Sequence, residues 1–343
     1  NKNNRDDMNK LFFRISLAAC ALALFVIVLG AYVRLSDAGL GCPDWPGCYG
    51  TLIAPSDSND IQAANEAYPE RPFEADKAWK EMIHRYFAST LGLLILAMAA
   101  IAIKRRKEQG QQLTLPLILL VVVCFQGALG MWTVTMLLKP AIVTLHLLGG
   151  MLTLALLCWA MLSDRQQKPA IVSRGLKNWA ILALVVVYCQ IALGGWTSTN
   201  YVALHCWDLP TCQGKWWPNT DFSEGFTIWR ELGVDYEGGT LSLEAGTAVH
   251  LTHRIGAVVT LLVVGTFALF LLRFSKGPGQ QGTRNLAILL LVLLCAQISL
   301  GILNIILVLP TAIAVAHNGG AALLLLTIVA INRKLSTDKQ KNT

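Results

Sequence analysis

The residues best suited to chemistry are four of the six histidines, because each lies just inside one end of a long apolar segment. A strongly polar side chain within a membrane-spanning helix is costly, and it usually faces a bundle interior or a functional pocket. Two neutral imidazoles on facing helices of a four-helix bundle commonly ligate a haem iron from both sides. Hydrogen-bonded helix packing would explain one such histidine equally well, but two repeated pairs favour haem ligation. The four are His84, His146, His253 and His317.

Zinc or copper is a weaker alternative at these histidines, because no carboxylate or thiolate repeats beside the pairs at the same depth. Two glycines closely follow two of the histidines, as Gly149-Gly150 and Gly319-Gly320. They would let a flat macrocycle approach the backbone. Ordinary packing of small residues between helices explains each glycine pair as well.

An arginine follows one histidine of each pair, at Arg85 and Arg254. We predict that these are haem-binding residues, because a guanidinium at this place could bind a haem propionate through charge-assisted hydrogen bonds. The alternative is that both side chains extend to the membrane interface.

The two halves differ one helical turn before these histidines. Glu81 stands three residues before His84, whereas His250 stands three residues before His253. Residues at this spacing share a helix face. A carboxylate on the haem side of one bundle only predicts that the first half does chemistry and the second serves it. The alternative is that Glu81 is an acid near a helix N-terminus, where the macrodipole stabilises it.

Four of the nine cysteines form two close pairs outside the apolar segments, Cys42 with Cys48 and Cys206 with Cys212. The outer side of a bacterial inner membrane is oxidising, so each pair predicts a short-loop disulfide. The first pair could also be redox-active, whereas we interpret the second as a structural staple. The other five cysteines fall within apolar segments and are predicted to be small core residues. His205 is predicted to lie on the surface.

The residues that carry the chemistry recur in the same order in two halves of the chain, which predicts a tandem duplication. Gly30 precedes Cys42 by 12 residues, and Gly194 precedes Cys206 by 12. Each half then has a His-Arg pair and a glutamine that stands 20 residues before a histidine. Four helices per half preserve orientation, so the axis relating the halves should lie along the membrane normal. The two glutamines are Gln126 and Gln297.

Eight apolar segments of about 20 residues position these side chains, and each is long enough to cross roughly 30 Å of hydrocarbon. Hydrophobic residues make up 54% of the 343 residues, charged residues make up 14%, and the mean hydropathy is +0.51, which excludes a soluble protein. The first segment lacks the small-residue cleavage site of a signal peptide. The segments are Leu11–Val33, Met82–Ile103, Leu113–Met136, Ala141–Leu162, Trp179–Thr199, Ala248–Leu272, Asn285–Leu309 and Thr311–Ile331.

The distribution of charge predicts that both termini are cytoplasmic. Of the 28 Lys+Arg residues, 19 fall on the side of the termini, together with five of the 21 Asp+Glu. The net charge of +7 therefore reports membrane orientation and does not indicate nucleic-acid binding. We predict an all-α, multi-pass protein of a bacterial inner membrane, surrounded by lipid and built from two pseudo-symmetric four-helix bundles. The halves would be residues 1–165 and 166–343.

The first outer loop resembles that of a known family. The run GAYVRLSDAGLGCPDWP, at residues 30–46, is similar to the first-loop signature of the haem A synthases, and Glu81-x-x-His84-Arg85 resembles the opening of their second helix. The resemblance extends from the first apolar segment to the eighth. It implies an oxidoreductase that converts a methyl group of haem O to the formyl group of haem A for cytochrome oxidase. The reaction would proceed by successive hydroxylations, after which the geminal diol loses water.

The resemblance also implies roles for residues of the N-terminal half. His84 and His146 would flank the substrate haem O. Glu81 would assist the reaction, and Cys42 and Cys48 would be the functionally linked cysteine pair.

In the C-terminal half, the resemblance implies that His253 and His317 ligate a resident haem b, with His250 as the departure at the duplicated glutamate position. The implied partners are a haem O synthase, the assembly of cytochrome oxidase and an electron-transfer partner.

Two other classes of protein would use the same four histidines. One is a dihaem cytochrome b that only passes electrons, and the other is a haem transporter or chaperone, which would explain tryptophans in the outer loops. Neither needs Glu81 or the first-loop run. Both predict that Glu81→Ala leaves their function intact, whereas a synthase should lose haem A and retain bound haem.

Overall fold

The computed structural model describes residues 2–108, 113–163, 174–277 and 279–336, and these residues contain helices and loops but no named β-strand. Eight of the described helices are long and apolar enough to cross a membrane, which confirms the predicted number of spans. The half boundary predicted at 165/166 lies outside the described residues. The eight are α1 (Lys2–Leu35), α3 (Ala75–Lys104), α4 (Thr114–Thr135), α5 (Pro140–Ser163), α6 (Arg174–Thr199), α8 (Leu243–Phe274), α9 (Gln281–Ile306) and α10 (Thr311–Ser336).

Several of these helices begin earlier than the apolar segments predicted, as α3 and α8 show. Helix α3 begins at Ala75 and not near Met82, and α8 begins at Leu243 and not near Ala248. The first turns are polar, and in α3 an ion pair of 2.5 Å joins Lys80 Nζ to Asp76 Oδ2. Backbone hydrogen bonding continues beyond the apolar residues, so hydropathy marks where the chain enters the membrane and not where the helix begins.

Two short helices in the long loops were not predicted. They are α2 (Ser58–Ala67) and α7 (Phe222–Gly225). An aspartate caps each N-terminus, because Asp57 accepts a hydrogen bond from the Asp60 amide and Asp221 accepts one from the Glu224 amide. Such short polar helices carry no apolar pattern that a sequence reading could detect.

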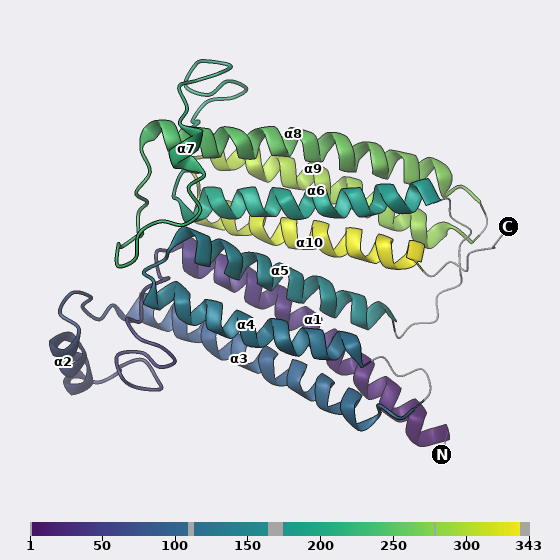
Figure 1. The fold of residues 1–343 in the computed structure, drawn as a ribbon, viewed down its shortest axis with the longest axis horizontal. Helices are drawn as coiled ribbons and strands as arrows, with labels where there is room; N and C mark the ends of the chain where they lie inside the picture. Colours follow the sequence, from purple (N-terminus) through teal and green to yellow (C-terminus); the bar gives the residue numbers. More distant parts are fainter. Residues whose placement is uncertain (1, 109–112, 164–173, 278, 337–343) are drawn as a thin grey trace.

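The helices pack in the same order in both parts of the chain (Figure 1). In the first part α1 contacts α3, α3 contacts α4, α4 contacts α5, and α5 returns to α1. Helices α6, α8, α9 and α10 repeat this cycle. The two cycles meet through α1, α5, α6 and α10, and α5 contacts its own counterpart, α10. The packing therefore follows the repeat in the sequence.

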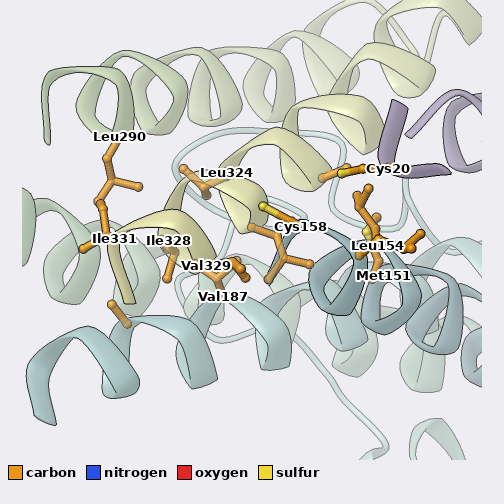
Figure 2. Close-up of a cluster of buried hydrophobic side chains, with 14 of the residues drawn as sticks. Cys20, Met151, Leu154, Cys158, Val187, Leu290, Leu324, Ile328, Val329 and Ile331 are labelled. Carbon is orange, nitrogen blue, oxygen red and sulfur yellow. The ribbon is translucent and has the colours of Figure 1, made fainter. Parts of the chain in front are cut away.

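An apolar core lies where the two sets of helices meet (Figure 2). Met151 and Leu154 of α5 and Ile328 of α10 have no exposed surface. Because lipid is as apolar as these side chains, close packing and not exclusion of water holds such helices together. A polar contact adds to this packing, since the Tyr188 hydroxyl of α6 donates to the Leu148 carbonyl of α5 at 2.7 Å.

The cysteines within the spans are only partly as predicted. Cys20 and Cys158 are buried in this core, whereas Cys124, Cys189 and Cys295 are exposed on the helix surfaces. A thiol is apolar enough to face lipid, so the apolar residues around each cysteine did not show whether it would be buried or exposed.

The long loops lie together at one end of the helices, opposite the end where α1 begins and α10 finishes (Figure 1). Arg71 in the first loop pairs with Asp235 in the second at 2.6 Å. Lys139, in the turn between α4 and α5, is only 1% exposed; its Nζ donates to the Arg230 carbonyl and lies 3.7 Å from the centre of the Trp229 ring. The second loop therefore covers the α4–α5 turn of the other half.

Candidate functional site

The four predicted histidines lie near the loop end of four helices, two in each half. His84 of α3 lies close enough to His146 of α5 for charges on the two rings to interact. The same holds for His253 of α8 and His317 of α10. The structure therefore brings together the two histidines that were predicted to act as a pair in each half.

Each histidine ring packs against a glycine on the preceding long helix. A Cβ atom added at these glycines would lie only 2.9–3.4 Å from the imidazole Cε1 atom, so a larger residue would displace the ring. These glycines let the two helices of each hairpin approach at the depth of the histidine. The pairs are Gly30 with His84, Gly130 with His146, Gly194 with His253 and Gly301 with His317.

Three of the histidines are also held by a glutamine on the same neighbouring helix. The glutamine Nε2 donates to the backbone carbonyl of the histidine at 2.8–3.0 Å. Gln190 was not predicted, because the glutamine pattern recurs between the two hairpins of the second half as well as between the halves. The signal was the motif Gln-x-x-Leu-Gly, which ends at Gly130, Gly194 and Gly301. The pairs are Gln126 with His146, Gln190 with His253 and Gln297 with His317.

The glycine pairs predicted to face a macrocycle contact these glutamines or other helices. A Cβ atom added at Gly149 or Gly320 would overlap the Oε1 atom of the paired glutamine. A Cβ at Gly150 would lie 3.4 Å from the same amide group, and one at Gly319 would lie 3.3 Å from Val28 of α1. These contacts are those of small residues packed between helices, which was the alternative explanation.

Glu81 is 5% exposed and lies beneath the first disulfide loop. Its Oε2 accepts the Cys42 amide at 2.9 Å, and its Oε1 accepts Arg85 Nη2 at 2.6 Å. Since α3 begins at Ala75, Glu81 is beyond the first turn, and the macrodipole does not explain its position. Both carboxylate oxygens are thus engaged, one by the loop and one by the neighbouring arginine.

Arg85 holds the disulfide loop as well as the glutamate. Its Nη1 donates to the carbonyls of Pro46 and Gly47, which lie between the two cysteines. The structure joins Cys42 to Cys48 by a disulfide. Arg85 therefore fixes the loop to the helix that carries His84, a role that sequence reasoning did not predict.

The second half repeats this arrangement without the carboxylate. Cys206 is disulfide-bonded to Cys212, and the Cys206 amide donates to His250 Nδ1 at 3.1 Å. Arg254 donates to the carbonyls of Cys206, Asp208 and Thr211 at 2.7–2.8 Å. His250 thus takes the place of the glutamate as hydrogen-bond acceptor, and the second half has no negative charge at this position.

These features fit one haem between the paired imidazoles of each half. The Nδ1 atoms of His84, His146 and His317 are buried with no hydrogen-bond partner within the described ranges. Haem iron needs only two such ligands from facing helices. Over the described part of the chain, no three His, Cys, Asp or Glu residues are grouped to hold a metal ion, which is the arrangement a zinc or copper site would more often use.

Residues 13–329 match the family model COX15-CtaA, described as cytochrome oxidase assembly protein. The chain is 45% identical over 314 residues to a heme A synthase from Shewanella oneidensis, covering 90% of this chain and 92% of that one. The chain belongs to the haem A synthase family. It is also 28% identical to heme A synthases from Allorhizobium ampelinum and from a Caulobacter species, covering 94% and 89% of this chain and 90% of each relative.

In this member of the haem A synthase family the two disulfide loops share a tight turn. Asp44 accepts the amides of Tyr49 and Gly50 at 2.6–2.7 Å, and Asp208 accepts those of the matching Gln213 and Gly214 at 2.6–2.9 Å. The hydrogen bond from the Thr211 hydroxyl, together with these two amides, lowers the pKa of the Asp208 carboxyl. The duplicated loops are therefore built alike, and their clearest difference is the acceptor below them.

His205 is half-buried, although it was predicted to lie on the surface. It packs against Gly246 of α8, where any side chain would collide with the imidazole. Burial lowers the pKa of His205 because the charged form loses hydration. The sequence around His205 does not indicate this contact, because Gly246 belongs to a different element.

Proposed function

We propose that this protein oxidises the methyl group of haem O to the formyl group of haem A. Successive hydroxylations would give a geminal diol, and loss of water from that diol would leave the formyl group. The observation that carries the proposal is Glu81, a buried carboxylate held by Arg85 and Cys42 beside one histidine pair and replaced by His250 beside the other. The similarity to heme A synthases over 90% of the chain supports it.

The N-terminal half, residues 1–165, would hold the substrate haem O between His84 and His146. Glu81 stands one turn before His84 on the same helix. Each of its oxygens accepts one donor and keeps a second acceptor site, through which it could receive or return a proton as the diol loses water. The first disulfide loop would exclude water from this end of the site, since it lies directly over the carboxylate.

The C-terminal half, residues 166–343, would hold a haem b between His253 and His317. A haem b bound there would supply one-electron transfer. In this half Arg254 holds the second loop on α8, and His250 keeps the loop amide satisfied without a charge. We assign this half a supporting role because none of its described residues is a buried carboxylate next to the histidine pair.

The same proposal includes the membrane arrangement and partners. Two pseudo-symmetric four-helix bundles with cytoplasmic termini would place both haem sites at the outer face of a bacterial inner membrane, in accord with the matched helix contacts and the distribution of Lys+Arg. A haem O synthase would supply the substrate, and cytochrome oxidase assembly would receive the product. An electron-transfer partner would accept the four electrons released as the methyl group becomes the formyl group, with water as the source of oxygen.

The test is extraction and chromatography of haems from membranes that contain this protein together with a haem O synthase. Wild type should accumulate haem A. Glu81→Gln should reduce haem A at least about a hundredfold and retain bound haem, because the amide keeps the volume but cannot exchange the proton. His250→Gln is the matched control in the other half, and it should retain haem A.

Two outcomes would contradict the proposal. Absence of haem A with haem-loaded wild type would favour a dihaem cytochrome b or a haem transporter. Equal haem A in wild type and Glu81→Gln would remove Glu81 from the reaction.

A further inference from the structure

The histidine hairpins are built on one plan, and one of the four departs from it. In the plan a glutamine donates to the backbone carbonyl of the histidine, and its Oε1 fits against a glycine three residues after that histidine. We call this pair of residues the glutamine clamp. The clamps are Gln126 with Gly149, Gln190 with Gly256 and Gln297 with Gly320.

The hairpin of α1 and α3 has neither residue of the clamp. Val26 takes the place of the glutamine, four residues before Gly30, and Phe87 takes the place of the glycine, three residues after His84. Phe87 instead packs edge-on against Phe25, with ring centroids 4.9 Å apart. Among the side-chain hydrogen bonds of the described residues, none ends on the His84 carbonyl, in contrast to the carbonyls of His146, His253 and His317.

The clamp acts on the position of the histidine, because it fixes the backbone from which the imidazole projects. In the second half the Gln190 amide also reaches the back of the ring, since its Nε2 lies 3.1 Å from His253 Nδ1, whereas Gln297 Nε2 lies 3.3 Å from His317 Nε2 and does not hold that ring from behind. Groups that hold a metal-ligating histidine from behind fix its orientation and strengthen its binding. His84 is the one histidine of the four without this support.

We propose that His84 is the ligand that leaves the iron of the substrate haem, and that Val26 and Phe87 are the positioning residues that leave it free to do so. This inference rests on the proposed function, in which the substrate half must take up haem O, open a position on its iron and release haem A. His146 would remain bound through its clamp. In the other half both ligands are clamped, as suits a haem that stays in place.

The iron–histidine bond would break without redox change, because the imidazole departs with its own lone pair and can return. His84 packs against Gly30, where a Cβ atom would lie 2.9 Å from the ring, but among the described residues no side chain donates a hydrogen bond to its carbonyl. The α1–α3 hairpin therefore offers close packing without the polar restraint that the other three hairpins share.

The experiment uses carbon monoxide, which binds a ferrous bis-histidine haem only when one histidine leaves. The protein is loaded with haem by expression with a haem O synthase, reduced, and mixed with carbon monoxide while absorbance is followed. In wild type we expect about half of the haem to react rapidly. The His84→Ala/His146→Ala variant, which should empty the substrate half, should lose that rapid fraction.

The double variant Val26→Gln/Phe87→Gly rebuilds the clamp. It should slow the rapid phase about tenfold, the effect of one net hydrogen bond. Phe87→Gly alone makes the space without the bond and should react as fast as wild type. Slower hydrogen exchange of the backbone amides that follow His84 would report that the new clamp has formed. An unchanged carbon monoxide rate in a variant with that protection would overturn the proposal.

The reciprocal variant Gln190→Val removes a clamp from the resident half, so the proposal does not depend on the rebuilt one folding. It should make the slow haem fraction react about tenfold faster, and an unchanged slow fraction would overturn the proposal. The readout needs no haem A: failure to make haem A with this pattern intact would refute the proposed function alone. Haem A formation without the pattern would refute only the role of His84.

Discussion

The contact between Arg85 and Glu81 allows a quantitative prediction about the first disulfide loop. The side chains are 13% and 7% exposed, and Nη2 lies 2.6 Å from Oε1. Arg85→Met would leave a buried carboxylate with the Cys42 amide as its remaining partner. Removing one member of a buried ion pair typically costs about 3–5 kcal/mol. We expect about 3 kcal/mol here, since Cys42 still donates to the carboxylate.

Opening of the loop would relieve this cost, because Glu81 would then be hydrated. The Cys42 amide should therefore exchange its hydrogen roughly a hundredfold faster in Arg85→Met than in wild type, since each 1.4 kcal/mol is about a factor of ten. Hydrogen exchange measured by mass spectrometry reports this local opening directly. In Glu81→Gln/Arg85→Met no charge remains to be buried, so the protection should return except for the share that the bonds from Arg85 to the Pro46 and Gly47 carbonyls contribute.

The second half provides the control, since Arg254 binds loop carbonyls and the acceptor is His250. The effects of Arg254→Met and His250→Gln on exchange of the Cys206 amide should be nearly additive. Additive effects of Arg85→Met and Glu81→Gln in the first half would refute the reasoning, because they would mean that the ion pair contributes no coupling.

Two further predictions concern packing and pH. Gly30→Ala should weaken haem binding in the first half about 5- to 150-fold, because the added methyl group would lie 2.9 Å from His84 Cε1 and overpacking costs about 1–3 kcal/mol. Gly130→Ala is the milder change, since its methyl group would lie 3.4 Å from His146 Cε1. Haem content measured by absorbance should therefore fall less in Gly130→Ala than in Gly30→Ala. Lowering the pH through the ordinary His range should loosen the second loop, because burial lowers the folded-state pKa of His205 and the unfolded loop binds the proton more readily. Stability is thus present above the unfolded pKa and lost as pH falls. His205→Gln should weaken that dependence in hydrogen exchange, because only His250, which accepts the Cys206 amide, then remains to be protonated. An unchanged dependence would exclude His205 as a cause.

The sequence predicted the eight spans and the histidine pairing because both depend on local patterns. The length of an apolar segment shows where a helix crosses the membrane. Equivalent histidines on equivalent helices therefore lie at the same depth. The contacts of Arg85 and Lys139 depend instead on loops that fold back over the helices, and hydropathy carries no information about that path. Apart from the pair of Arg85 with Glu81 within α3, the partners of these two cations were therefore absent from the local sequence.

The glutamines show a different limit of prediction from sequence. Their motif was present, but it repeats from hairpin to hairpin and not only from half to half. Comparing halves matched Gln126 with Gln297, but the motif also relates the two hairpins within the second half through Gln190. A glutamine inside an apolar helix needs a partner, and a backbone carbonyl of the adjacent helix supplies it. The structure was needed to show that each glycine after a histidine makes room for that amide.

Differences between duplicated parts separate what the fold requires from what one half does alone. Close helix approach at the histidines and docking of the disulfide loop occur in both halves, so they belong to the common framework. The differences lie on the first hairpin. Glu81 occupies the position equivalent to His250, Val26 the position equivalent to Gln190, and Phe87 the position equivalent to Gly256. Glu81 and Phe87 are on α3, each three residues from His84 on opposite sides in sequence, and Val26 is on the helix packed against it. Random drift after duplication would scatter such changes over the bundle. Their convergence on the surroundings of one histidine is the arrangement expected if that histidine, and not its three counterparts, has to move while a proton is transferred beside it.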